Sequence, residues 1–202
     1  MLVKPFSNSI IKATSIFLLL ASIYSCHYSE KLVERTILLN DNLGQIRLKL
    51  PAYCDSFTQK KGTITPDSLK GDFFDYSAYT YSTTNKNNFP KLTVSFKHHL
   101  IDDASTDITF DNTSCLEFLS NNRNLSWFLT DYSIERNCFY INKRYFASEI
   151  SGVQDETENG INVRAYTGIG RRFLITNIRM TSQDTTGIYS KVLEILHSIY
   201  IK

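Results

Sequence analysis

The chain has 202 residues, of which 42% are hydrophobic and 13% aromatic, with 22 Lys and Arg against 20 Asp and Glu. This composition excludes an intrinsically disordered tail, a collagen-like repeat and a polytopic membrane protein. A chain of this length can bury roughly 70% of its unfolded surface, which is enough for one hydrophobic core without help from a metal ion or disulfides.

The N-terminal segment has the pattern of an export signal. Lys4 and Lys12 give it a positive start, no acidic residue precedes Glu30, and residues 16–23 are almost entirely apolar. A secretory signal needs about 7–15 apolar residues, whereas a membrane-spanning helix needs about 20. We therefore predict a signal peptide over residues 1–25.

The signal ends in Ile23-Tyr24-Ser25-Cys26, which resembles the lipobox of bacterial lipoproteins. In that family a branched aliphatic residue lies three positions before the cysteine and a small residue directly before it; Tyr24 stands where a small residue is usual. The resemblance implies that Cys26 becomes the acylated N-terminus. It also implies a domain outside the cytoplasm, anchored to the inner or outer membrane of the cell envelope. Ordinary cleavage near Ser25 would instead leave Cys26 a plain thiol.

The charge balance of the chain after the signal peptide bears on whether it binds nucleic acid. Removal of residues 1–25 takes away two lysines and no acid, so 20 basic residues balance 20 acidic ones. Such a neutral chain is a poor candidate for binding nucleic acid.

The cysteines of the remaining chain allow a disulfide. Besides Cys26 there are three of them, which can form one disulfide in three ways. Among the pairings we favour Cys115–Cys138, because both lie near predicted elements of one region. Buried free thiols are an equal alternative.

Hydrophobic periodicity predicts the elements of the first half of the chain. Residues 26–34 are expected to be a polar tether, and residues 35–202 a single domain. Alternation of apolar and polar side chains is typical of half-buried strands, and turn residues separate them. The expected elements are a hairpin of strands 36–39 and 45–50 ended by Pro51, an irregular segment 52–72, an aromatic strand 73–82, a turn 85–88 and a strand 91–100.

The second half predicts helices as well as strands. It contains an expected helix 113–121, a turn or short helix around Trp127, strands 137–153 (broken near Asn142-Lys143), 161–167 and 172–181, and a tight turn at Asn159-Gly160. Ile188, Val192, Ile195, Leu196 and Ile199 form one apolar stripe of a closing helix, whose first turn Asp184 or Thr185 can cap. We therefore expect an α+β fold, an antiparallel β-sheet with helices packed on it.

This order of elements resembles the PsbP-like α/β/α sandwich, a family that includes small bacterial envelope lipoproteins. The early hairpin ending in Leu48-Lys49-Leu50-Pro51, the late strand meander and the closing helix from Ser190 to Ser198 carry the resemblance. Members of the family do unrelated jobs, so the resemblance implies a fold and leaves the function open.

The aromatic strand supplies the candidate binding residues. Tyr76, Tyr79 and Tyr81 lie close together in sequence, and alternation along a strand places about half of such side chains on an exposed face. Exposed tyrosines are common anchors for protein or carbohydrate partners. The alternative is an ordinary strand with one face in the core.

Motifs for catalysis, metals and cofactors are weak throughout the sequence. There is no GxSxG, HExxH, Walker or GxGxxG motif, and Gly168-Ile169-Gly170 is better explained as a turn. His98 and His99 are expected on opposite faces of a strand, and an exposed charged turn accounts for Arg171-Arg172. The acidic residues of 155–160 and Asp102, Asp103, Asp107 and Asp111 are expected in solvated loops. We predict no metal site and no cofactor.

These observations favour a non-enzymatic envelope lipoprotein. Its domain would bind an envelope protein partner or support an assembly, and it would contact the membrane through its lipid. Two alternatives remain: an immunity-type lipoprotein that neutralises a toxin, and an enzyme such as a hydrolase with an unrecognised site.

Overall fold

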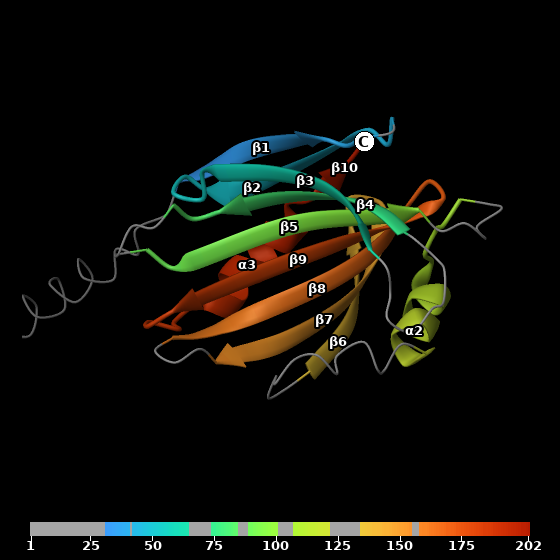
Figure 1. Ribbon diagram of the computed structural model, residues 1–202. Coiled ribbons are helices and arrows are strands. Elements are labelled where there is room, and N and C mark those ends of the chain that lie inside the picture. Colours follow the sequence, from blue (N-terminus) through green and yellow to red (C-terminus); the bar gives the residue numbers. More distant parts are fainter. Residues whose placement is uncertain are drawn as a thin grey trace, which may run out of the picture. The chain divides into compact units, whose positions relative to one another are not determined.

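Alternating apolar and polar residues run through much of the chain from Leu32 onward, and they form antiparallel strands. The computed structural model describes residues 31–40, 42–64, 74–84, 89–100, 107–121, 134–154 and 158–202. Residues Leu32–Lys202 belong to one compact unit. Within the described part, about 60% of residues lie in strands and about 15% in two short helices. The strands are divided between a small and a large sheet (Figure 1).

The small sheet has three antiparallel strands, with β2 in the middle. Its strands are β1 (Leu32–Leu38), β2 (Gln45–Pro51) and β10 (Tyr200–Ile201), in the order β1-β2-β10. In β2 the alternate residues Ile46, Leu48 and Leu50 are fully buried, as their spacing predicts. β1 begins at Leu32, so residues 32–34, which the sequence placed in the tether, belong to this strand.

The large sheet has seven strands, and every neighbouring pair is antiparallel. In sheet order the strands are β3 (Ser56–Ile64), β4 (Phe74–Ser82), β5 (Lys91–Leu100), β9 (Arg172–Ser182), β8 (Asn159–Ile169), β7 (Arg144–Gln154) and β6 (Ile134–Ile141). One face is apolar: Leu92, Val94 and Phe96 of β5 lie on it, beside Ile178 and Met180 of β9.

The main core lies where this apolar face meets the small sheet and helix α3 (Ile188–His197). The helix contacts β8, β9 and β2, and it is seen behind β5 and β9 in Figure 1. It buries Ile188, Val192, Ile195 and Leu196, which are residues of the predicted stripe. Both sheets are therefore joined through a single apolar cluster to which α3 contributes.

Helix α2 (Asn112–Asn121) packs elsewhere, against β6 and β7. Its buried residues Cys115 and Leu119 form a second, smaller cluster with Ala147 and Tyr166. The side chains of Ala147 and Tyr166 lie on the face of the large sheet opposite the main core, because these residues are next to the core residues Phe146 and Ala165 along their strands. The helix expected over residues 113–121 is present; Trp127 lies outside the described residues.

The expected α+β fold, and with it the PsbP-like α/β/α sandwich, is wrong. The molecule is a β-rich fold of two antiparallel sheets with two helices of 10 residues each. Strand content was underestimated. The four strands expected between residues 137 and 181 are present but longer, three of them with 11 residues, whereas β3 and β10 were not expected. The helices are too short to form layers over a seven-stranded sheet.

Three local expectations are also corrected. Residues 52–72 were expected to be irregular, yet β3 lies within them, since pairing with β4 stabilises a polar segment that has little alternation of its own. Gly160 is a residue of β8 and not of a turn: a Cβ there would collide with the carbonyl oxygen of Met180 on β9. The final helix has no side-chain cap from Asp184 or Thr185, because it begins after Gly187, whose φ is 75°.

Candidate functional site

The turn between β6 and β7 forms one wall of a candidate site. Its two residues, Asn142 and Lys143, have φ values of 47° and 68°. A two-residue hairpin turn with positive φ at both positions matches the twist of the strands, and Asn adopts this conformation readily. The Nδ2 of Asn142 donates a hydrogen bond of 2.6 Å to the carbonyl oxygen of Ile199. The hairpin tip is thereby fixed to the segment that joins α3 to β10.

Two further side chains tie this hairpin to β8. Arg144 donates from Nη1 to the carbonyl oxygen of Gly168 at 3.0 Å, and Thr167 donates from Oγ1 to the carbonyl oxygen of Tyr145 at 2.9 Å. The segment before α2 passes close over β8 at the same place, where a Cβ on Gly168 would collide with the carbonyl oxygen of Ile108. The backbone N–H of Ile108 donates to the carbonyl oxygen of Gly170 at 2.7 Å. Four segments distant in sequence thus meet here.

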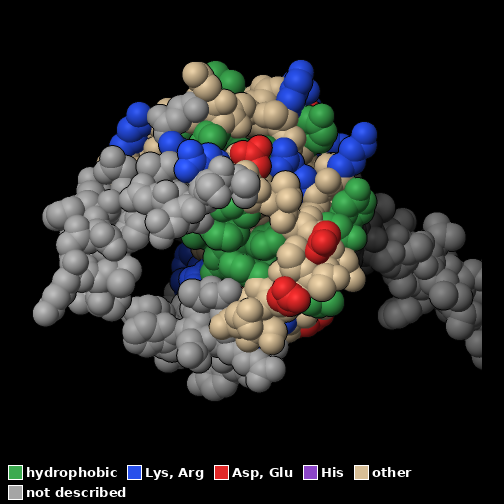
Figure 2. Space-filling model, turned by 90° about the vertical axis from the view of Figure 1, so that its right-hand side faces the viewer, with side chains coloured by type: hydrophobic (Ala, Val, Ile, Leu, Met, Phe, Trp, Pro, Cys, Tyr) green, Lys and Arg blue, Asp and Glu red, His purple; other side chains and the backbone are tan. Residues whose placement is uncertain are grey.

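Together these segments line a cavity of about 520 Å³ that is open to solvent on one side. This volume lies within the range of about 300–1,000 Å³ typical of ligand pockets. The cavity lies at the end of the large sheet where the β6–β7 and β8–β9 hairpins turn. Figure 2 shows the molecule from the right-hand side of Figure 1, with hydrophobic side chains gathered at the middle of that face. The lining residues are Ile108, Thr109, Phe110, Asn142, Lys143, Arg144, Tyr145, Thr167, Gly168, Tyr200 and Ile201.

The lining combines positive charge with aromatic rings. Its charged residues are Lys143 and Arg144, and its aromatic residues are Phe110, Tyr145 and Tyr200. Lys143 is exposed. Arg144 has five N–H donors, one of which donates a hydrogen bond to the carbonyl oxygen of Gly168. None of these lining residues is an Asp or a Glu. Such a site favours a ligand that carries a negative charge and an apolar group.

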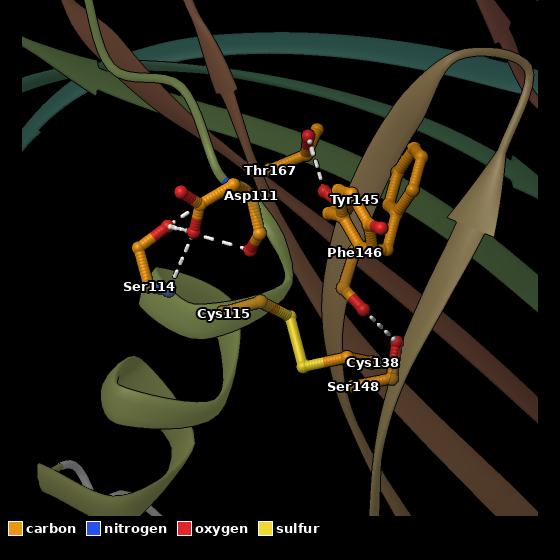
Figure 3. Close-up of a disulfide and its surroundings, with 8 residues drawn as sticks. All are labelled: Asp111, Ser114, Cys115, Cys138, Tyr145, Phe146, Ser148 and Thr167. Atoms are coloured by element: carbon orange, nitrogen blue, oxygen red, sulfur yellow. Dashed lines mark hydrogen bonds between the residues drawn. A yellow bond between two sulfur atoms is a disulfide. The ribbon is translucent and has the colours of Figure 1, made fainter.

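A disulfide and α2 support the aromatic side of the cavity. Cys115 and Cys138, the pair that the sequence favoured, are joined in the structure, with their Cα atoms 6.1 Å apart (Figure 3). The bond links α2 to β6. Phe110 and Tyr145 pack against the same small cluster as the disulfide, so two of the three aromatic lining residues are positioned by it.

The start of α2 is fixed by its own cap. The carboxylate of Asp111 accepts hydrogen bonds from the backbone N–H of Ser114 at 2.7 Å and from its Oγ at 2.8 Å (Figure 3). These hydrogen bonds favour the ionised carboxylate and lower the pKa of Asp111 below its usual value of 3.8. Phe110 directly precedes this cap, so the cap also limits the movement of a lining residue.

The three candidate tyrosines do not form an exposed ledge. Tyr79 is fully buried and Tyr81 is 8% exposed, because both lie on the core face of β4. The hydroxyl of Tyr79 accepts a hydrogen bond from the backbone N–H of Asn40 at 2.7 Å. Tyr76 lies on the opposite face, where the Nζ of Lys97 is 4.4 Å from the centre of its ring. Alternation along the strand separates Tyr76 from the other two.

The other candidate residues lie apart from the cavity or outside the described residues. Cys26, Asp102 and Asp103 belong to the segments that are not described. Asp107 and Asp111 are exposed, and His98 is buried with its Nδ1 3.2 Å from Nη1 of Arg172. Within the described ranges, no three His, Cys, Asp or Glu side chains come together in a way that could hold a metal ion.

The remaining cysteine, Cys54, is a buried thiol in the main core. Burial raises the pKa of Cys54 from 9.0 to about 12. The reactive form of a cysteine is the thiolate, so this residue is suited to packing and not to chemistry at neutral pH.

Sequence reasoning missed the cavity residues, although one signal pointed to them. Asn142-Lys143 was recognised as a break between strands, and a two-residue turn places the next residue, Arg144, directly opposite Ile141.

Neither described helix is long and apolar enough to cross a bilayer. No protein-family model, characterised protein or solved structure matches the chain.

Proposed function

We propose that the protein is a lipid-anchored lipoprotein of the cell envelope, and that its domain binds a protein partner through the cavity without catalysing a reaction. The observation that carries the binding role is the cavity itself, in which cationic and aromatic side chains lie together and the segments that carry them are joined by hydrogen bonds from Asn142, Arg144 and Thr167. Polar groups that are held in position before a ligand binds are typical of recognition sites.

The position of the cavity relative to the start of the domain supports a tethered role. Leu32, at the beginning of β1, pairs with Pro51 at the end of β2, whereas Ile201 of the cavity wall pairs with Ile46 near the start of β2. Five residues of a strand span about 17 Å. The domain therefore begins at the end of β2 that is remote from the cavity.

The anchor is tested by metabolic labelling with an alkyne-tagged fatty acid. We expect label on the wild-type protein and none on Cys26→Ala, because the proposed acceptor is the amino-terminal cysteine. The same cells report the location by fractionation, in which the wild type should follow the membranes. Equal labelling of both proteins, or of neither, contradicts the anchor.

The binding site is tested by photo-cross-linking in living cells. We place p-benzoylphenylalanine at Tyr200, which lines the cavity and is 44% exposed, and in a control at Tyr189, which lies on α3 outside the lining and is 41% exposed. We expect a discrete cross-linked protein from position 200 only. Its identity separates an envelope assembly partner from an incoming toxin. Identical cross-links from both positions, or none from position 200, contradict a partner site in the cavity.

A further inference from the structure

We infer that the cavity recognises an acidic peptide, in which one carboxylate pairs with Lys143 and Arg144 while a neighbouring aromatic or aliphatic side chain packs on Phe110, Tyr145 and Tyr200. The inference rests on the proposed function and names the chemistry of the partner at that site. The two cations and three rings line one cavity of about 520 Å³.

The cationic side chains determine the charge of the ligand. Lys143 and Arg144 are consecutive, and none of the residues lining the cavity is an acid that would neutralise them. Arg144 is positioned by its hydrogen bond of 3.0 Å to the carbonyl oxygen of Gly168, and four of its N–H donors remain beyond that bond. A guanidinium held in this way matches the planar, two-oxygen geometry of a carboxylate.

The aromatic side chains require more than an anion. Tyr200 is 44% exposed, and Phe110 and Tyr145 are partly buried against the α2 cluster. A free anion would pair with the cations and leave these rings in contact with water, whereas a purely apolar ligand would bury the cations without a partner. Only a ligand with both groups satisfies the lining.

Size and charge favour a peptide over a polyanion. The cavity is far larger than a carboxylate and has room for about two side chains within the usual range of ligand pockets. Its two cations balance one or two negative charges, and the chain after residue 25 has equal numbers of basic and acidic residues. Inorganic phosphate, which carries the same charged group as a lipid phosphate headgroup, is therefore an outcome that the experiment must separate from a peptide.

The test is an NMR titration of the purified, ¹⁵N-labelled full chain with three probes: N-acetyl-Phe-Glu-amide, N-acetyl-Phe-Gln-amide and inorganic phosphate. We expect saturable shifts at the backbone amides of Tyr145, Gly168 and Ile108 with the Glu peptide. The Gln peptide should bind about tenfold more weakly, because it lacks the charge-assisted hydrogen bonds. Phosphate should bind more weakly than the Glu peptide, because it cannot contact the rings.

Two variants assign the effect to the cavity. Lys143→Asn removes the charge with a residue that tolerates the φ of 68°, and it should weaken the Glu peptide about tenfold. Lys60→Gln removes the same charge from exposed β3, away from the lining, and should leave affinity unchanged. The ¹⁵N spectrum of each variant verifies its fold; Lys143→Gly, which also accepts positive φ, replaces the first variant should its spectrum change.

Three outcomes of the titration overturn the inference. Equal binding of both peptides shows an apolar site, equal binding of phosphate shows a simple anion site, and no shift with the Glu peptide shows no site. If the protein with p-benzoylphenylalanine at position 200 still forms its cross-link when it also carries Lys143→Asn, the proposed binding function stands and recognition of an acidic peptide is contradicted. Peptide binding without any cross-link would retain the ligand class and remove the protein partner.

Discussion

The two helices have the same length and are stabilised in different ways. Both contain 10 residues, but α3 buries four apolar side chains in the main core between the two sheets, whereas α2 buries only Cys115 and Leu119. An isolated helix of this length is marginal in water, so each depends on tertiary contacts. For α3 these contacts are hydrophobic; for α2 a disulfide to β6 adds a covalent one.

The cavity lies between these two regions. Tyr200 and Ile201 reach it from the strand that follows α3, and Phe110 and Tyr145 reach it from the α2 cluster. One part of its wall is thus supported by the large hydrophobic core and another part by the small cluster that the disulfide joins. Damage to the main core should therefore unfold the domain, whereas damage around α2 should alter the cavity first.

The largest effect is expected in the main core. Leu196→Ala, at a fully buried residue of α3, should lower the free energy of unfolding by about 3–5 kcal/mol, because it removes buried methyl groups and leaves a void. Leu116→Ala on α2, where the side chain is 53% exposed, should change it by less than about 0.5 kcal/mol. Urea denaturation followed by circular dichroism measures both. Similar losses in the two variants would contradict the contrast between the helices.

Removal of the disulfide should lower the free energy of unfolding by somewhat less than Leu196→Ala does. The double variant Cys115→Ser, Cys138→Ser opens a link between residues 23 apart in sequence and should lower the free energy of unfolding by about 2–4 kcal/mol. Hydrogen exchange locates the effect: amides of α2 should lose protection while those of α3 keep most of theirs. Uniform loss across both helices would show that α2 belongs to the main cooperative unit.

The cap of α2 should make a smaller contribution that depends on pH. Asp111→Ala removes the acceptor of two hydrogen bonds from Ser114 and should reduce amide protection in α2. Because the pKa of Asp111 is lowered in the folded state, its stabilising effect is present above the unfolded value of 3.8 and is lost as the pH falls through the folded value.

Asp111→Asn is the matched control for that prediction. An amide oxygen can still accept the hydrogen bond at the helix start, but it does not titrate in this range. We therefore expect near wild-type protection at neutral pH and no acid-dependent loss from this position. A wild-type acid transition that persists unchanged in Asp111→Asn would assign it to another carboxylate.

The smallest effect is expected at Cys54. Since burial raises the pKa of its thiol to about 12, iodoacetamide should leave Cys54 unmodified in the native protein near pH 8 and modify it in urea. Mass spectrometry of the Cys54 peptide measures the difference. The raised pKa also means that stability should decline as the pH rises from 9.0 towards 12, because only the unfolded thiol then releases its proton. Rapid native labelling would place the thiol at the surface.

The sequence predicted elements wherever periodicity was strong. Strand β5 and the stripe of α3 were recognisable because apolar residues recur at spacings of two and of three to four. β3 was missed because Ser56–Ile64 contains Phe57 and Ile64 but little alternation, so its strand conformation depends on pairing with β4. That missed strand, and the length of β7 to β9, explain why the fold class was wrong.

The cavity was beyond the reach of sequence patterns for a different reason. Its lining comes from segments around residues 108–110, 142–145, 167–168 and 200–201, which meet only through long-range contacts such as that of Asn142 with Ile199. The aromatic residues of β4 were considered as binding candidates because they lie close together in sequence, with an ordinary half-buried strand as the alternative. Density in sequence does not measure exposure: alternation puts Tyr79 and Tyr81 in the core.

The pairing of the last residue with β2 has a practical consequence. Lys202 exchanges two backbone hydrogen bonds with Gln45, of 2.9 and 3.0 Å, and its carbonyl oxygen lies where only a glycine fits at position 44. Any residues that follow Lys202, whether native or an affinity tag, therefore emerge next to Tyr200 and Ile201. Affinity tags and fluorescent fusions are better placed at another position, because an attachment after Lys202 would compete with a ligand that enters the cavity beside Tyr200 and Ile201.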